Sequence, residues 1–160
     1  MDDAAVEYAA THRFRVVPAA YLLLRRGEDV LLQLREGTGF MDGHWAAAAA
    51  GHVEADESVF DAACREAREE LGVVIRPQDL MPLTTMHRTQ QNHQAVDERV
   101  DFFFECRVWD GEPRLLEAEK AADLGWFSLD VLPHPVVPHE EHVLDLWRDG
   151  ALPPVVTFGF

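Results

Sequence analysis

The chain has 160 residues, 48% of them hydrophobic, which fits one globular domain with a sizeable core and excludes a disordered or low-complexity chain. It carries 29 acidic and 14 basic residues, a formal charge of −15, which argues against nucleic acid or an anionic membrane surface as a partner. An anionic substrate would need a divalent cation to offset the repulsion.

The first third of the chain predicts two strands joined by a turn. Residues 1–11 have no strong pattern and are expected to form a loose lead or a short helix. Residues 15–24 and 30–34 are rich in Val and Leu around a Gly-Glu-Asp turn, which favours a hairpin. A glycine-spaced loop is expected over 37–43, while the alanines at 46–50 are too few to decide between helix and strand.

The remainder predicts helices alternating with strands. A helix is expected over 58–71 because a glycine follows it, and a last helix over 140–148. Strands are expected over 80–88, 99–109 and 125–127. Strands mixed with separated helices indicate an α/β sheet with helices packed on it.

The helix expected over 58–71 gathers three carboxylates on one side. At about 100° per residue, Glu66, Glu69 and Glu70 share an arc of roughly 100°. Like charges at this spacing destabilise a helix slightly, and a bound divalent cation would reverse the sign. On the same wheel Arg65 and Arg68 point away from the carboxylates. The alternative is a solvated acidic helix face.

The spacing around these carboxylates matches the box G-x5-E-x7-R-E-U-x-E-E-x-G-U, where U is aliphatic or small. Its seven fixed positions are filled by Gly51, Glu57, Arg65, Glu66, Glu69, Glu70 and Gly72. The chain therefore resembles the Nudix hydrolases, over roughly residues 12–150. The resemblance implies a Nudix-fold α/β/α sandwich with a mixed sheet and the loop-helix motif, as a single domain over 1–160. One departure is Asp56, where the family often has glycine.

Roles in metal binding follow from the resemblance. Glu66 and Glu70 are expected to be the principal ligands of Mg²⁺, or alternatively Mn²⁺. Glu69 is expected to be a third ligand or a base, and the Gly51 carbonyl a further ligand. The reaction implied is attack by water on a diphosphate linkage.

Supporting and catalytic roles follow in the same way. Glu57 and Arg65 are expected to support catalysis by locking the loop to the helix. A glutamate before the Trp126 strand serves as general base in several Nudix hydrolases. Glu119 is the first candidate here and Glu117 the second, and an exposed loop carboxylate is the alternative.

Substrate contacts are less well marked. Arg35 ends a strand where the family often has an arginine that contacts phosphate. Phe103 stands alone on the polar face of its strand, so it either stacks on a base or lies under the last helix. His139 and His142 at the start of that helix are interpreted as a solvated helix end.

The function implied is Mg²⁺-dependent hydrolysis of a nucleoside diphosphate linked to another group, most simply a nucleoside triphosphate. Neither the Pro nor the Tyr that marks Nudix subgroups for ADP-ribose or dinucleoside polyphosphates is present in the window around 87–91. The alternatives are a nucleotide-sugar or other diphosphate hydrolase, and a nucleotide-binding module without hydrolysis. With two cysteines and no basic signal region, the protein is expected in the cytoplasm, with a homodimer left open.

Overall fold

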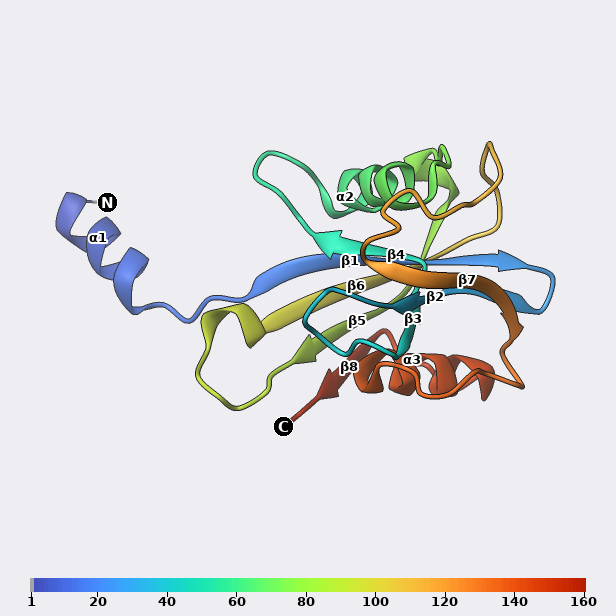
Figure 1. The fold of residues 1–160 in the computed structure, drawn as a ribbon. Helices are drawn as coiled ribbons and strands as arrows, with labels where there is room; N and C mark the ends of the chain where they lie inside the picture. The colour runs from blue at the N-terminus through green and yellow to red at the C-terminus, as the bar shows by residue number, and fades with distance from the viewer. Residues whose placement is uncertain (1) are drawn as a thin grey trace.

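The computed structural model of the protein describes residues 2–160, in which helices cover both faces of a mixed sheet (Figure 1). The strands are β1 (Val17–Arg26), β2 (Asp29–Arg35), β3 (Trp45–Ala47), β4 (Ala49–His52), β5 (Leu80–Arg88), β6 (Arg99–Cys106), β7 (Ala121–Ser128) and β8 (Val155–Phe158). The helices are α1 (Asp3–His12), α2 (Val59–Glu66) and α3 (Pro138–Arg148), with short segments η1 (Ala67–Leu71), η2 (Pro77–Asp79) and η3 (Ala95–Asp97). The expected α/β/α sandwich is confirmed.

Strand β1 connects the two parts of the sheet. It pairs in parallel with β6, which continues to β5 and β8, and antiparallel with β4 along Ala19–Leu22. Its last residues form the expected hairpin with β2, and β2 in turn pairs with both β3 and β7. As a result, Ala20 of β1 lies directly beside Gly51 of β4.

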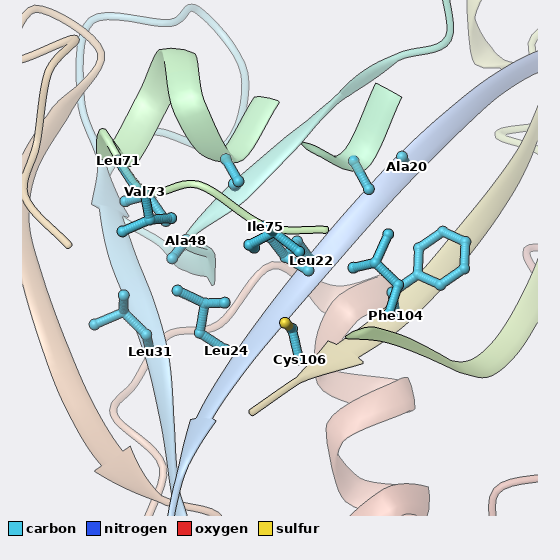
Figure 2. Packing of buried hydrophobic residues seen from close by; sticks show 14 of the residues in the cluster. Ala20, Leu22, Leu24, Leu31, Ala48, Leu71, Val73, Ile75, Phe104 and Cys106 are labelled. Atoms are coloured by element: carbon cyan, nitrogen blue, oxygen red, sulfur yellow. The ribbon is translucent and has the colours of Figure 1, made fainter. Parts of the chain in front are cut away.

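Alternating side chains of β1 enter two different cores. Ala20, Leu22 and Leu24 pack under α2 and η1, in the cluster of Figure 2. Tyr21 and Leu23 point to the other face and join the cluster under α3. Because β1 is buried on both faces, its sequence is a continuous apolar run rather than an alternating one.

The alanine run at 46–50 forms two short strands rather than a helix. Ala46 to Ala49 are each at most 3% exposed, between the two helical layers. Tertiary packing thus overrides the helix propensity of alanine. Strand β8 was not predicted; it is short, follows two prolines, and pairs in parallel with the edge of β5.

The N-terminal segment is a helix, the second of the two forms expected. Asp2 caps α1 by accepting from the Ala5 N–H at 2.8 Å. None of its residues is buried, and Figure 1 shows the helix beyond the start of β1, away from the sheet. Met1 lies outside the described residues. Within residues 2–160, no helix combines the length and the apolar character needed to cross a bilayer.

The helix expected over 58–71 has two parts. Ser58 and Asp61 form a capping box that starts α2. From Ala67 the chain widens into the π-helical segment η1, and it ends at Gly72, whose φ of 70° suits glycine. A π-helical turn inside an α-helix is rare and frequently occurs at a functional site.

Candidate active site

Arg65 connects the loop after β4 to α2. Its Nε and Nη2 donate to the two carboxylate oxygens of Glu57 at 3.0 and 2.7 Å, and Nη2 also donates to the His52 carbonyl at 3.0 Å. Glu57 accepts a further bond from the Glu54 N–H at 2.8 Å. The hydrogen bonds from Arg65 lower the pKa of Glu57 to about 2, so this carboxylate stays charged. These contacts hold the loop against the helix.

The third arm of Arg65 contacts the carboxylates of the helix itself. Its Nη1 donates to Glu66 at 2.7 Å and to Glu69 at 3.2 Å. The prediction that Arg65 points away from the carboxylates is therefore wrong. A helical wheel fixes the direction of Cβ, whereas a long arginine side chain lies along the helix surface and reaches sideways.

Glu66 lies directly over the backbone of Gly51. A Cβ atom at position 51 would overlap the Glu66 carboxylate, so any residue other than glycine would displace that carboxylate from its present place. The Glu66 side chain is 13% exposed, and burial raises its pKa. In the same loop Asp56 has φ 67°, which explains why glycine is common at this position and why a short polar residue is tolerated.

Glu70, in η1, is the most deeply placed carboxylate of the box. Its Oε2 accepts from the Ala50 N–H at 2.8 Å, next to Gly51. Burial raises the pKa of Glu70 to about 8, and the nearby charges of Glu66 and Glu117 add to the rise. Glu66 and Glu70 thus converge on the same short piece of β4, as the shared helix face predicts, whereas Glu69 is half-exposed.

The loop before β7 brings Glu117 rather than Glu119 to these carboxylates. The Leu116 N–H donates to the Glu70 carbonyl at 3.0 Å, and the charge of Glu117 raises the pKa of both Glu66 and Glu70. Glu117 itself pairs with Lys120 at 3.0 Å. Glu119, the first candidate from the sequence, is exposed, and its carbonyl lies against Gly37.

The donor set fits a divalent cation. Two half-buried carboxylates, Glu66 and Glu70, repel one another beside a third, Glu117, while Arg65 and Lys120 supply the nearby positive charge. Within residues 2–160, no three His, Cys, Asp or Glu side chains already form a ready metal-binding group. Mg²⁺ suits such a site, because it is usually held by one or two carboxylates, with water and substrate phosphates completing its shell.

A cavity of about 350 Å³ opens beside Gly51 and continues over the α3 face of the sheet. Its lining includes Ala50 and Gly51, which touch the carboxylates above, and Arg35 and Phe40 at the other side. Arg35 Nε donates to the Phe40 carbonyl at 2.8 Å, and no carboxylate in the described residues pairs with it. The predicted position of Arg35 near the substrate is therefore compatible with the structure.

Buried polar groups form the floor of this cavity. Arg88 donates to Asp101 and, at 3.4 Å, to the Tyr21 hydroxyl, which also bonds to His139 Nε2 at 3.1 Å. Glu140 accepts from the Ala47 N–H at 2.7 Å, and burial raises its pKa to about 7. Sequence reasoning missed this network, because its members come from β1, β5, β6 and α3 without any shared spacing.

Two predictions about this side of the sheet are corrected. His139 is 5% exposed, and burial lowers its pKa to about 2, so it is a buried neutral imidazole and not part of a solvated helix end. Phe103 is 2% exposed, stacks on Tyr21 with ring centroids 4.6 Å apart, and packs in the cluster that contains Val143 of α3. Its ring therefore has no face open to a base. The alternative prediction, that Phe103 is buried under the last helix, agrees with the structure.

Comparisons with known proteins agree with this geometry. The family model of the NUDIX domain matches residues 14–147. The NAD-capped RNA hydrolase NudC of Pseudomonas aeruginosa (strain LESB58) is 30% identical over 148 residues, which cover 89% of this chain and 49% of NudC. The chain thus spans about half the length of that relative.

Two further similarities cover most of both proteins. The uncharacterized Nudix hydrolase YvcI of Bacillus subtilis (strain 168) is 30% identical over 129 residues, 80% of this chain and 77% of YvcI. The crystal structure of the MutT NUDIX hydrolase from Burkholderia pseudomallei superimposes with a TM-score of 0.72 at 28% identity, covering 82% of this chain and 97% of that one. With the complete box and its carboxylates gathered over β4, the chain belongs to the Nudix family and is a Nudix hydrolase.

Proposed function

We propose that this Nudix hydrolase cleaves the diphosphate linkage of a nucleoside diphosphate linked to another group, with a nucleoside triphosphate as preferred substrate and Mg²⁺, or alternatively Mn²⁺, as cofactor. One observation carries the proposal. Glu66 and Glu70 converge on Ala50 and Gly51 of β4. Ala50 and Gly51 also line the adjoining cavity. A diphosphate held at the carboxylates would thus place its nucleoside in the cavity.

In this proposal Glu66 and Glu70 hold the cation, with the Gly51 carbonyl as a further ligand. When bound, the cation would offset the charge of the substrate phosphates and favour attack by water. Water adds to one phosphorus as the bridging P–O bond breaks, so a triphosphate yields a nucleoside monophosphate and pyrophosphate. Arg65 and Glu57 keep the carboxylates in place through the contacts described above.

The proton of the attacking water needs an acceptor. We assign that role to Glu117, because its charge acts on Glu66 and Glu70, while Glu119 is exposed. Glu69 is half-exposed and contacts Arg65, which supports a charge-balancing role. A base must lie within hydrogen-bond reach of the proton it removes, directly or through one water.

The cavity supports a substrate with one nucleoside. Its volume of about 350 Å³ is near the small end for ligand pockets and leaves little room for a second nucleoside. Arg35 is placed to contact a phosphate, and Phe40, 39% exposed, offers the ring that Phe103 does not. The Glu140 carboxyl gives the cavity a polar group for the edge of a base.

A hydrolysis screen with Mg²⁺ tests this function. The substrates are nucleoside triphosphates, nucleotide sugars and dinucleotides such as NAD, the last included because one relative is named an NAD-capped RNA hydrolase. We expect triphosphates to lead and to yield pyrophosphate, detected with a coupled pyrophosphatase. A nucleotide sugar or dinucleotide ahead by about tenfold in specificity constant, or ~1.4 kcal/mol, would overturn the triphosphate assignment.

The same screen separates hydrolysis from simple nucleotide binding. If calorimetry shows that nucleotides bind while no substrate is cleaved with either Mg²⁺ or Mn²⁺, the chain acts as a nucleotide-binding module. The cytoplasmic location, the single-domain extent of 1–160 and a homodimer remain predictions.

A further inference from the structure

A second hollow lies at the opposite end of β1 from Gly51. It has a volume of about 520 Å³ and is lined by Arg25, Arg26, Gly27, Arg107, Val108 and Trp109. We call it the arginine hollow. Figure 1 shows the turn between β1 and β2 at the end of the sheet away from α1. Arg25 is five residue steps along the strand from Ala20, the partner of Gly51, so the two sites are about 17 Å apart.

Arg25 is a buried arginine without an acidic partner. It is 5% exposed, and its Nε and Nη2 donate only to the carbonyls of Asp29 and Gly27, at 3.2 and 3.3 Å. Among residues 2–160, no carboxylate forms an ion pair with it, and Nη1 has no protein acceptor but is open to solvent. Burial and the positive charge of Arg107 lower its pKa, and the charges of Glu105, Glu28 and Asp29 only partly offset this. A buried charge is costly unless it is paired, so an anion in the hollow would supply what the protein does not.

Two more guanidinium groups border the hollow. Arg107 donates Nε to Glu105 at 2.6 Å and Nη1 to the Gly27 carbonyl at 3.2 Å, which leaves Nη2 without an acceptor in the described residues. Arg26 is loosely paired with Glu112 at 3.6 Å. Arg107 and Arg25 thus meet at the Gly27 carbonyl, whereas Arg26, the next residue of the strand, points to the opposite face and borders the hollow from the Trp126 side.

Indole rings hold the arginines in place and offer a flat surface. The Arg26 guanidinium lies 4.4 Å from the centre of the Trp126 ring, and Trp126 stacks on Trp109 at 6.0 Å. On the other side, Arg25 lies 4.5 Å from the Trp147 ring. Arginine forks match phosphate oxygens in a bidentate manner, and an aromatic face stacks on any base.

We propose that the arginine hollow binds the phosphate of a small nucleotide, with the base against Trp109. The ligand is a mononucleotide rather than a nucleic-acid strand, because the net charge of −15 repels a long polyanion. The site is separate from the diphosphate-cleaving centre and needs no metal.

Calorimetric titration of the full chain in EDTA tests the proposal, because removing divalent cations disables nucleotide binding through the carboxylates. The probes are AMP, inorganic phosphate and a short single-stranded oligoadenylate. Arg107→Gln removes an exposed member of the hollow, and its matched control Arg13→Gln removes the same charge at an exposed position near α1. We expect AMP affinity to fall at least tenfold in Arg107→Gln and to stay at the parental value in the control.

Each probe has a contradicting outcome. Equal AMP affinity in both variants, or no binding by the parent, would overturn the site. Inorganic phosphate binding as tightly as AMP, or unchanged AMP affinity in Trp109→Leu, would overturn the stacking contact. An affinity per phosphate that is higher for oligoadenylate than for AMP would overturn the choice of a mononucleotide. Hydrolysis of the best substrate should be unaffected by Arg107→Gln.

Discussion

Glu66 and Glu70, on the α2 side of the sheet, and Asp101, on the α3 side, have different charged neighbours. Above, Glu66 and Glu70 are partly buried next to one another, and the pKa of each is raised by burial and by neighbouring carboxylates. Below, Asp101 is fully buried but contacts Arg88 and faces Arg99 at 3.8 Å. Burial raises the pKa of Asp101 as well, but the charges of Arg88 and Arg99 oppose that rise. Glu70 has no arginine partner, so it is shorter of positive charge than Asp101.

From this difference we expect the α2 side of the sheet to carry the reaction and the α3 side to recognise the substrate. A group of carboxylates that is short of positive charge gains stability from a cation, so the upper side can assemble a reactive centre only when metal and substrate arrive. The lower network is held by hydrogen bonds among Arg88, Asp101, Tyr21 and His139, although Arg99 Nε and Asp101 Oδ1 have no hydrogen-bond partner among the described residues, and it gives the cavity a polar floor. Substitutions above should therefore change turnover, and substitutions below should change stability or substrate preference.

The largest effect is expected for Glu70→Gln. Turnover of the best substrate should fall by ~100- to 1000-fold, because the variant loses a charge that stabilises the cation and the developing phosphate charge. In EDTA the variant should melt at a higher temperature than the parent, since the parent must bury a carboxylate that prefers to be neutral. Steady-state kinetics and thermal melts measure the two effects. Glu7→Gln on exposed α1 is the control, and parental turnover in Glu70→Gln would refute the metal assignment.

Next in size is the contrast between Glu117→Gln and Glu119→Gln. If Glu117 accepts the proton, its substitution should lower kcat by ~100-fold with little change in KM, as for an interaction made in the transition state. Glu119→Gln should stay within about twofold of the parent, because its side chain is exposed. Measuring both variants at saturating Mg²⁺ decides between them. The reverse order of effects would return the role to Glu119.

Arg65→Lys should lower activity by ~10- to 100-fold, the usual cost of losing a group that orients metal ligands. Lysine keeps the charge but cannot contact Glu57, Glu66 and Glu69 at once, as the three arms of Arg65 do. The apparent Mg²⁺ affinity should weaken along with the rate. Arg68→Lys, at an exposed position in the adjoining segment η1, is the control. Identical Mg²⁺ titrations for both variants would show that Arg65 orients nothing.

The two sides of the sheet also differ in how far the sequence predicts them. The upper site lies within 23 consecutive residues, so the fixed spacing predicted which carboxylates meet, and Glu66 and Glu70 do meet over Gly51. The spacing did not determine which neighbours a long side chain or a flexible loop would contact. The end of the Arg65 side chain and the choice between Glu117 and Glu119 depend on rotamers and loop folding, which periodicity does not encode.

The site on the α3 side could not be predicted, because its residues are far apart in sequence and come together only when the strands pair and α3 packs on them. Tyr21 and His139 are 118 residues apart in sequence and meet only because α3 packs on the face of β1 that points away from α2. Phe103 shows the same limit. A phenylalanine on a polar strand face looks like a binding residue until the helix that covers it is placed. The alanine strands β3 and β4 likewise depend on burial from both sides.

The smallest effect on activity, and the most direct test of the lower side, is expected for Glu140→Gln. Burial raises the pKa of Glu140 to about 7 in the folded protein, against 4.5 for the ordinary carboxyl. Between these values the folded state binds more protons than the unfolded state, so this carboxyl makes stability fall as pH rises, and the loss is complete above pH 7. Glutamine does not titrate and still offers Ala47 an acceptor oxygen.

The free energy of unfolding of the parent, relative to that of Glu140→Gln, should therefore decrease by up to about 3 kcal/mol between pH 4.5 and pH 8. Denaturant melts of both proteins across this range measure it, and the subtraction removes titrations that the two share. These include that of His139, whose lowered pKa acts with the opposite sign and costs stability as pH falls below about 6.5. A difference that stays flat with pH would mean that Glu140 ionises as freely in the folded chain as in the unfolded one. The Glu140 carboxylate would then be hydrated in the folded protein, so the floor of the cavity would not be rigid. The contrast between the two sides of the sheet would not hold.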